Sequence, residues 1–160
     1  MKKVNVLFCC MGNICRSPTA QGVFEHHVHK AQLTHLIEVD SAGTHAYHVG
    51  EQPDGRSQAC ALRRGIDLSG QRARKVTVSD FDRFDYVLAM DRSNYDDLAA
   101  VCHEQQQDKL HMFLSFAPDL AVSDVPDPYY GGSNGFDQVF DLVDAAAQGL
   151  LRHILAKDLA

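Results

Sequence analysis

Cys10 and Arg16 stand near the beginning of the chain with five residues between them. An apolar run over residues 4–9 precedes the thiol, and Ser17-Pro18 after the guanidinium is typical of a helix start. A loop placed between a strand and a helix can turn its backbone N–H groups inward, where they favour a phosphate-like dianion. A thiolate that attacks a phosphate ester forms a cysteinyl-phosphate. The spacing therefore predicts phosphoryl transfer with Cys10 as the nucleophile.

The residues inside this loop have types that suit the same chemistry. Gly12 and Asn13 tolerate the left-handed backbone that an anion-binding loop needs. The planar fork of Arg16 can hold two oxygens at once, and together with the helix dipole it favours the thiolate of Cys10. Ser17 can donate a hydrogen bond to the sulfur when the sulfur leaves. The alternative, a simple turn after a buried cysteine, leaves the arginine and the glycine unexplained.

Asp127 is the candidate general acid. It stands between Pro126 and Pro128, which restrict its backbone, and Tyr129 and Tyr130 follow as possible walls of a cleft. A carboxylic acid there could protonate the leaving alkoxide and, once deprotonated, activate water for hydrolysis of the intermediate. An ordinary Asp-Pro turn is the alternative that the local sequence leaves open.

The composition bounds the protein class. The chain has 160 residues, 45% of them hydrophobic, which predicts one soluble globular domain over residues 1–160. The net charge of −6 argues against broad nucleic-acid binding, and we expect no membrane segment and no signal peptide. The expected lack of both predicts a cytoplasmic protein, and in a reducing compartment its five cysteines, without a C-x-x-C pair, are expected to be free thiols. The nine histidines show no zinc-ligand pattern, so we expect no metal.

The hydrophobic pattern predicts strands that alternate with helices, as in an open parallel α/β sheet. We expect strands over residues 4–9, 37–42, 86–90 and 110–116. We expect helices from an N-cap at Ser17, over residues 54–64, from an N-cap at Asp91 to about residue 101, and over residues 136–154. Gly65 has the position of a C-terminal cap glycine. Ligands of such sheets bind beyond the carboxyl ends of the strands, where Cys10 is expected.

The two motifs, Cys10–Pro18 and Asp127–Tyr130, together resemble those of the low-molecular-weight protein tyrosine phosphatases. Segments 39–43, 84–88 and 90–94 also resemble family segments in family order, so the resemblance covers nearly the whole chain. It implies a four-stranded parallel sheet flanked by helices on both faces, with the phosphate-binding loop after the first strand. It also implies a phosphotyrosine-containing protein or small aryl phosphate as substrate, no cofactor, and a monomer with weak self-association.

The resemblance also assigns roles to residues. It implies that Cys10 is the nucleophile, Arg16 binds the phosphate and the transition state, and Asp127 is first acid and then base. The other members of the implied phosphate loop and its support are Met11, Gly12, Asn13, Ile14, Cys15, Ser17 and Ser41. The implied walls around the substrate ring are Met11, Tyr47, Tyr129 and Tyr130. In the family a neighbour such as Cys15 can form a reversible disulfide with the nucleophile, and a small buried filler is the alternative for this residue.

Two other functions compete with the phosphatase. An arsenate reductase of related fold would need a relay of further cysteines, but Cys60 and Cys102 are widely spaced. A non-catalytic phosphotyrosine-binding module would need neither a nucleophile nor an acid. The chain also departs from the family pattern at Cys9, Tyr47 and Gln71, where an aliphatic residue, tryptophan and histidine are common.

Overall fold

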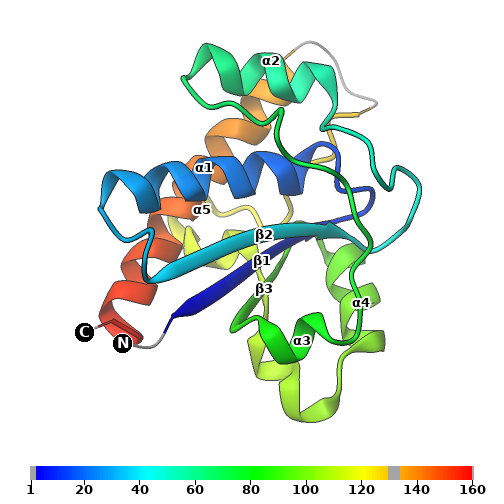
Figure 1. The fold of residues 1–160 in the computed structure, drawn as a ribbon, viewed down its shortest axis with the longest axis vertical. Helices are drawn as coiled ribbons and strands as arrows, with labels where there is room; N and C mark the ends of the chain where they lie inside the picture. Colours follow the sequence, from blue (N-terminus) through cyan, green and yellow to red (C-terminus); the bar gives the residue numbers. More distant parts are fainter. Residues whose placement is uncertain (1–2, 130–133, 160) are drawn as a thin grey trace.

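A computed structural model describes residues 3–129 and 134–159 of the protein. Within these residues, four parallel strands form one sheet. The strands are β1 (Val4–Cys10), β2 (Ile37–Gly43), β3 (Tyr86–Ala89) and β4 (Leu110–Met112). Their spatial order is β2-β1-β3-β4. The chain therefore moves from β1 to one side and then crosses to the other, which confirms the predicted parallel α/β sheet (Figure 1).

Helices cover both faces of this sheet (Figure 1). On one face lie α1 (Arg16–Lys30), α2 (Gly55–Arg63) and α5 (Gly135–Lys157), and on the other lie α3 (Asp80–Arg83) and α4 (Arg92–Val101). Short 3-10 helices cover residues Glu104–Lys109, Phe113–Phe116 and Pro118–Leu120.

The alternation of side chains along β1 explains why both faces are covered. Val6 and Phe8 belong to the hydrophobic core beneath α1 and α5, whereas Leu7 and Cys9 belong to a second core against α3 and α4. All four side chains are fully buried. Successive residues of a strand point to opposite faces, so an apolar run without alternation requires cover on both sides.

Several predicted helix ends are confirmed. Asp54 caps α2 by accepting from the backbone N–H of Arg56 at 2.8 Å, and Asp91 caps α4 by accepting from Asn94 N–H at 2.8 Å. Gly65 follows α2 with a φ of +82°, which only glycine adopts without strain. The short helix α3 was not predicted.

The predicted strand over residues 110–116 is too long. Strand β4 ends at Met112, and a 3-10 turn over Phe113–Phe116 carries the chain away from the sheet. The turn lets Phe113 pack edge-to-face on Phe8, with 5.0 Å between the ring centroids. The run is therefore a short strand followed by a turn, and its buried residues are Leu110 in the strand and Phe113 and Leu114 in the turn.

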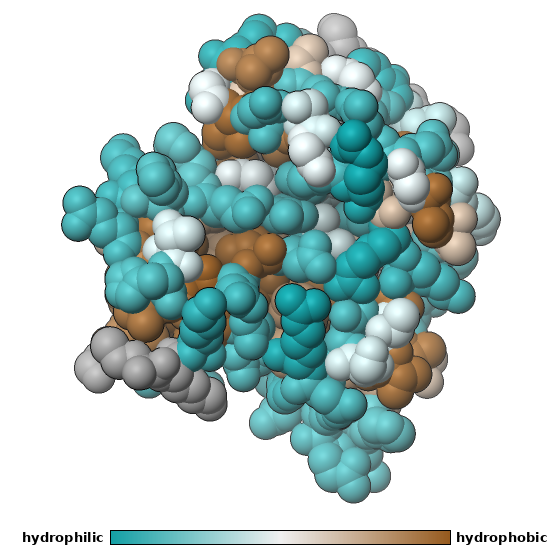
Figure 2. All heavy atoms as spheres, viewed as in Figure 1, coloured by the Kyte–Doolittle hydropathy of each residue, from teal (hydrophilic) through white to brown (hydrophobic). Residues whose placement is uncertain are grey.

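The carboxyl ends of β1 and β3 lie side by side at the point where the chain reverses its direction across the sheet. Cys10 ends β1, and Asp91 comes two residues after the end of β3. Open α/β sheets bind ligands at such a switch point. Figure 2 shows that the surface in this view is mainly hydrophilic, with its hydrophobic residues in separate small groups. None of the helices over residues 3–129 and 134–159 has the length and apolar content to cross a membrane.

Candidate active site

The loop between β1 and α1 is tied to the scaffold through its carbonyl groups. The carbonyl of Cys10 accepts from Thr44 N–H at 2.9 Å, and that of Met11 accepts from His45 N–H at 3.0 Å. In a trans peptide the C=O and the following N–H point in opposite directions. The N–H groups of Met11 and Gly12 therefore point away from the scaffold. Together with the backbone N–H groups of Arg16 and Ser17 at the start of α1, they can face a bound anion.

The sulfur of Cys10 lies beside a hydroxyl. Cys10 Sγ is 3.0 Å from Ser17 Oγ, and Asn13 Nδ2 donates to the same oxygen at 2.8 Å. Because Asn13 occupies the oxygen as donor, the hydroxyl hydrogen of Ser17 can point at the sulfur and stabilise a thiolate. The prediction that Ser17 caps α1 is wrong: the N-cap is Cys15, and Ser17 is the second residue of the helix. The hydroxyl of Ser17 lies against the sulfur of Cys10 and makes no capping hydrogen bond at the helix end.

Asn13 holds the loop from inside. It has the predicted left-handed conformation, with a φ of +59°. Its Nδ2 also donates to Ser41 Oγ at 3.0 Å, and Ser41 passes its own hydrogen to Gln21 Oε1 at 2.6 Å. Its Oδ1 accepts from the backbone N–H of Arg74 at 3.1 Å. All polar atoms of this buried amide therefore have partners, which fixes the position of Ser17.

Two residues near Asn13, Arg74 and Gln71, support the loop and the start of α1. The guanidinium of Arg74 binds Asp40 and Asp80, and its backbone N–H donates to Asn13. Gln71 makes no hydrogen bond to the loop asparagine, and its Nε2 donates to Pro18 O at 3.0 Å instead.

Gly12 serves a different purpose from the predicted one. Only Gly50 and Gly65 have positive φ among the glycines that the structure describes, so Gly12 is not left-handed. A Cβ on Gly12 would lie 3.0 Å from Cδ2 of His48. The glycine therefore allows the imidazole to pack on the loop, where Glu51 holds its Nδ1 at 2.9 Å.

Arg16 is buried and firmly oriented. Its Nη1 donates to Asp91 Oδ2 at 2.6 Å and to the carbonyl of Val125 at 3.0 Å. Burial lowers the pKa of this guanidinium, but the charges of Cys10, Asp91 and Asp127 outweigh that effect and raise it, so Arg16 remains a cation. The contacts through Nη1 leave the Nη2 side of the fork available to phosphate oxygens.

Asp127 reaches the same place from a distant part of the chain. Its Oδ2 lies 3.9 Å from Arg16 Nη2, and its Oδ1 accepts from Tyr129 N–H at 3.0 Å. The chain just before Asp127 is anchored, because Val125 N–H donates to the carbonyl of Met90, one residue beyond the end of β3, at 2.8 Å. The side chain is 38% exposed, so it can exchange a proton with a ligand or with water.

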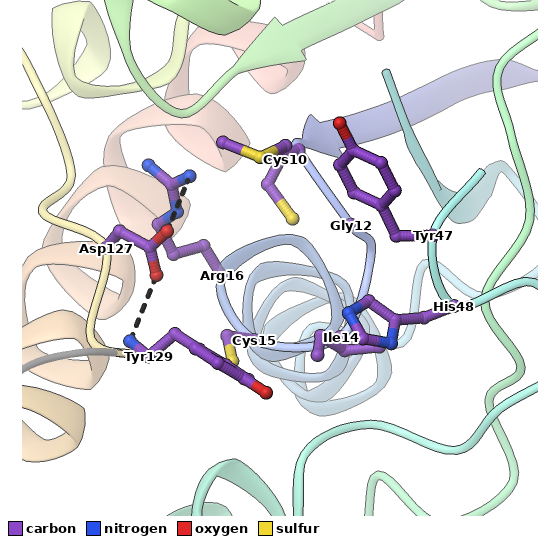
Figure 3. Close-up of a pocket in the computed structure, with 10 residues that line it drawn as sticks. Cys10, Gly12, Ile14, Cys15, Arg16, Tyr47, His48, Asp127 and Tyr129 are labelled. Atoms are coloured by element: carbon purple, nitrogen blue, oxygen red, sulfur yellow. Dashed lines mark hydrogen bonds and ion pairs between the residues drawn. The ribbon is translucent and has the colours of Figure 1, made fainter. Parts of the chain in front are cut away.

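These side chains surround a cavity of about 430 Å³. In Figure 3, Arg16 and Asp127 lie on one side of the Cys10 sulfur, and Tyr47 and His48 lie on the opposite side. Tyr47 is 66% exposed, so its ring is open to a ligand. The cavity is lined by Cys10, Met11, Gly12, Ile14, Cys15, Arg16, Tyr47, His48, Asp127 and Tyr129. Tyr130, the remaining predicted wall, lies outside the described residues.

Cys15 is a poor nucleophile in this arrangement. It is 5% exposed, and burial together with the nearby charge of Asp54 raises its pKa to about 12, although a hydrogen bond with Ser57 lowers it. A thiol with this pKa is almost entirely protonated at neutral pH. The contacts favour its reading as a buried filler of the loop, and the disulfide with Cys10 stays a prediction.

The sequence predicted Asp91 only as a helix cap and not as a partner of Arg16, and it did not indicate that His48 lines the cavity. The position of Asp91 after the carboxyl end of a parallel strand was a usable signal, because such ends meet at one edge of the sheet. His48 lies one residue beyond Tyr47 in a polar loop, and nothing in its local pattern indicates the cavity. Within the described part of the chain, no cluster of three or more His, Cys, Asp or Glu side chains is placed to hold a metal ion.

Comparison with known proteins agrees with this geometry. Residues 5–160 match the family described as low molecular weight phosphotyrosine protein phosphatase. A low molecular weight phosphotyrosine protein phosphatase of Schizosaccharomyces pombe is 43% identical over 155 residues, which cover 96% of this chain and 98% of the relative. A protein tyrosine phosphatase structure from Entamoeba histolytica is 39% identical with a TM-score of 0.93, over 99% of this chain and 100% of the other. YfkJ from Bacillus subtilis superposes with a TM-score of 0.94 at 35% identity, over 99% and 98% of the two chains. The chain therefore belongs to the low molecular weight phosphotyrosine protein phosphatase family, a family of hydrolases.

Proposed function

We propose that this protein hydrolyses phosphotyrosine and related aryl phosphate monoesters through a cysteinyl-phosphate at Cys10. The observation that carries the proposal is the meeting of Cys10, Arg16 and Asp127 in one cavity, although Asp127 is more than 100 residues away along the sequence. The same cavity combines a nucleophile, a fixed cation and a proton donor, which are the three groups that phosphoryl transfer to a thiolate needs.

In the first step, the thiolate of Cys10 attacks phosphorus as the bond from phosphorus to the phenolic oxygen breaks. Asp127 gives its proton to the departing oxygen, so tyrosine leaves as the neutral phenol. Arg16 and the loop N–H groups bind the non-bridging oxygens, whose charge is spread in the transition state. The contacts of Arg16 with Asp91 and Val125 hold its fork in place before the substrate arrives.

In the second step, the carboxylate of Asp127 takes a proton from water as the water oxygen attacks phosphorus. The bond between sulfur and phosphorus breaks, and inorganic phosphate and the Cys10 thiolate are formed. The Ser17 hydroxyl, held at 3.0 Å from the sulfur, stabilises the charge that returns to it. Asn13 keeps this hydroxyl in place through its own hydrogen bond.

The preference for aryl esters follows from the cavity walls. Tyr47 and Tyr129 both line the cavity that holds Cys10, so their rings can contact the phenyl ring of a substrate. An alkyl phosphate lacks that contact area. We therefore infer that phosphotyrosine in a protein, or a small aryl phosphate, is the substrate class.

The decisive assay measures aryl phosphate hydrolysis by the wild type, Cys10→Ser and Asp127→Ala. We expect no turnover for Cys10→Ser. For Asp127→Ala we expect kcat/KM to fall by about two to four orders of magnitude, the usual contribution of general acid catalysis. Turnover by Cys10→Ser at the wild-type rate would reject the covalent mechanism. Arsenate reduction in the absence of esterase activity would select the arsenate reductase instead.

The structure gives little support to a thiol relay. The thiol of Cys60 donates to Asp137 Oδ1 at 3.2 Å, and burial and this carboxylate raise its pKa to about 11. Cys102 follows the end of α4 and does not line the cavity.

We further propose a cytoplasmic location, which the five free cysteines support. We also propose a monomer with weak self-association, which sedimentation would test.

A further inference from the structure

We infer that Arg56 is a positioning residue for Asp127: it clamps the acid-bearing loop to the N-terminus of α2, and through Asp54 to the phosphate loop. The inference rests on the proposed role of Asp127 as general acid and base. It adds a physical link between two loops that Arg16 already connects through its hydrogen bond to the carbonyl of Val125 at 3.0 Å and its 3.9 Å contact with Asp127.

One end of the link is the pair of Asp54 and Arg56. The carboxylate of Asp54 accepts from Nε of Arg56 at 3.1 Å through Oδ1 and from Nη2 at 3.0 Å through Oδ2, so the guanidinium plane is held at two points. Asp54 is itself attached to the phosphate loop, because its backbone N–H donates to the carbonyl of Ile14 at 2.7 Å. The guanidinium is therefore fixed relative to the loop that carries Cys10.

The other end of the link is the backbone of Tyr129. Arg56 Nη1 donates to the carbonyl of Tyr129 at 3.2 Å, and the guanidinium carbon lies 5.2 Å from the centroid of the Tyr129 ring. It also lies 4.7 Å from the ring of Phe136 at the start of α5. The N–H of Tyr129 holds Asp127 Oδ1 at 3.0 Å. Arg56 thus restrains the residue whose backbone orients the carboxyl group.

Asp127 needs such a restraint because its side chain is substantially exposed. On the N-terminal side, Val125 N–H fixes the loop to the carbonyl of Met90, and Arg56 supplies an anchor on the C-terminal side. Only a guanidinium can bind a carboxylate through two nitrogens and reach a carbonyl with the third. Lysine would keep the charge but not both attachments.

A merely structural role predicts something different. Asp54 and Arg56 could serve only to stabilise the first turn of α2, and then the loss of Arg56 would lower stability without changing how the reaction depends on its leaving group. Arg63, on the same helix, is a matched control. Its side chain is 62% exposed and contacts Asp137 at 3.3 Å, whereas that of Arg56 is 51% exposed.

The test compares the wild type, Arg56→Gln, Arg56→Lys and Arg63→Gln on aryl phosphates whose phenols range from acidic to weakly acidic. An acidic phenol leaves without help, whereas a weakly acidic phenol needs a positioned proton donor. We expect Arg56→Gln to lower kcat/KM for the weakly acidic phenols by about tenfold to a hundredfold, the scale of a catalytic group displaced by about 1 Å. The most acidic phenols should lose much less, Arg56→Lys should be intermediate, and Arg63→Gln should match the wild type.

A double variant completes the experiment. Because Arg56 acts through Asp127, Arg56→Gln combined with Asp127→Ala should be no slower than Asp127→Ala alone. Equal losses for all leaving groups, or additive losses in the double variant, would overturn the inference. Wild-type behaviour of Arg56→Gln beside a strong effect of Asp127→Ala would reject this inference alone. A wild-type kcat/KM for Asp127→Ala would instead reject the proposed role of Asp127 as the general acid.

Discussion

Asp91 offers the most informative perturbation, because its two carboxylate oxygens serve two different elements. Oδ1 caps α4 by accepting from Asn94 N–H at 2.8 Å, and Oδ2 holds Nη1 of Arg16 at 2.6 Å. Asparagine is as good a helix cap as aspartate but carries no charge. The change Asp91→Asn therefore keeps the cap and the size of the side chain, but it replaces Oδ2 by an NH2 group, which cannot accept from Nη1 of Arg16, and so removes this hydrogen bond together with its charge.

The structure sets the size of the expected effect. The side chains of Arg16 and Asp91 are 3% and 21% exposed, so the contact is shielded from water. A hydrogen bond between charged groups contributes about 1.5–3 kcal/mol. If this orientation of Arg16 is needed in the transition state, kcat/KM falls by about 10-fold to about 150-fold, since 1.36 kcal/mol corresponds to tenfold. Asp91→Ala should lose about 1 kcal/mol more stability through the lost cap, with little further loss of activity.

The assay is steady-state hydrolysis of an aryl phosphate, together with urea unfolding of each variant. Asp96→Asn is the control, because Asp96 on the same helix pairs with Arg92 and both side chains are more than 60% exposed. An exposed pair of this kind contributes little, so we expect wild-type rates. Wild-type kcat/KM in Asp91→Asn would show that Val125 and the loop orient Arg16 without the carboxylate, and the reasoning would be refuted.

Two further predictions concern packing and thiol reactivity. A Cβ on Gly149 would lie 1.8 Å from the carbonyl oxygen of Phe116, so Gly149→Ala should lower the free energy of unfolding, measured in urea, by about 1–3 kcal/mol. Gly70 has open space around it, so Gly70→Ala should be tolerated. Unchanged stability of Gly149→Ala would contradict this prediction. The pKa of Cys15 is raised to about 12, so in Cys10→Ser its alkylation should be negligible at neutral pH and should rise about tenfold per pH unit up to about pH 12. Peptide mapping of alkylated Cys15 at pH 7 checks that expectation, and rapid labelling there would contradict it.

Most elements of the fold were predictable because their ends follow local rules, although α3 was not predicted and the strand from residue 110 is shorter than predicted. Asp54, Gly65 and Asp91 stand at helix ends where their side chains or backbone conformations have a local function. The errors arose where tertiary contacts used the same residues for something else. Ser17 has the composition of a helix cap, but the sulfur of Cys10 and Asn13 occupy its hydroxyl. Local sequence cannot show that competition.

The candidate site divides in the same way. Cys10, Arg16 and Asp127 could be proposed from residue type and spacing, because their chemistry depends on their side chains. Two supports of the site use backbone groups instead: the N–H of Arg74 donates to Asn13, and the carbonyl of Tyr129 accepts from Arg56. Backbone groups do not depend on the type of side chain. No sequence motif encodes them, so only the folded chain reveals these supports.

The central claim is that a covalent bond forms between Cys10 and phosphorus during turnover. Rapid quenching of the wild type with an aryl phosphate, followed by mass spectrometry of its peptides, tests this most directly. The account predicts one phosphoryl group on the peptide that contains Cys10, and none on that peptide in Cys10→Ser. Full turnover without any phosphorylated Cys10, or turnover by Cys10→Ser, would contradict it.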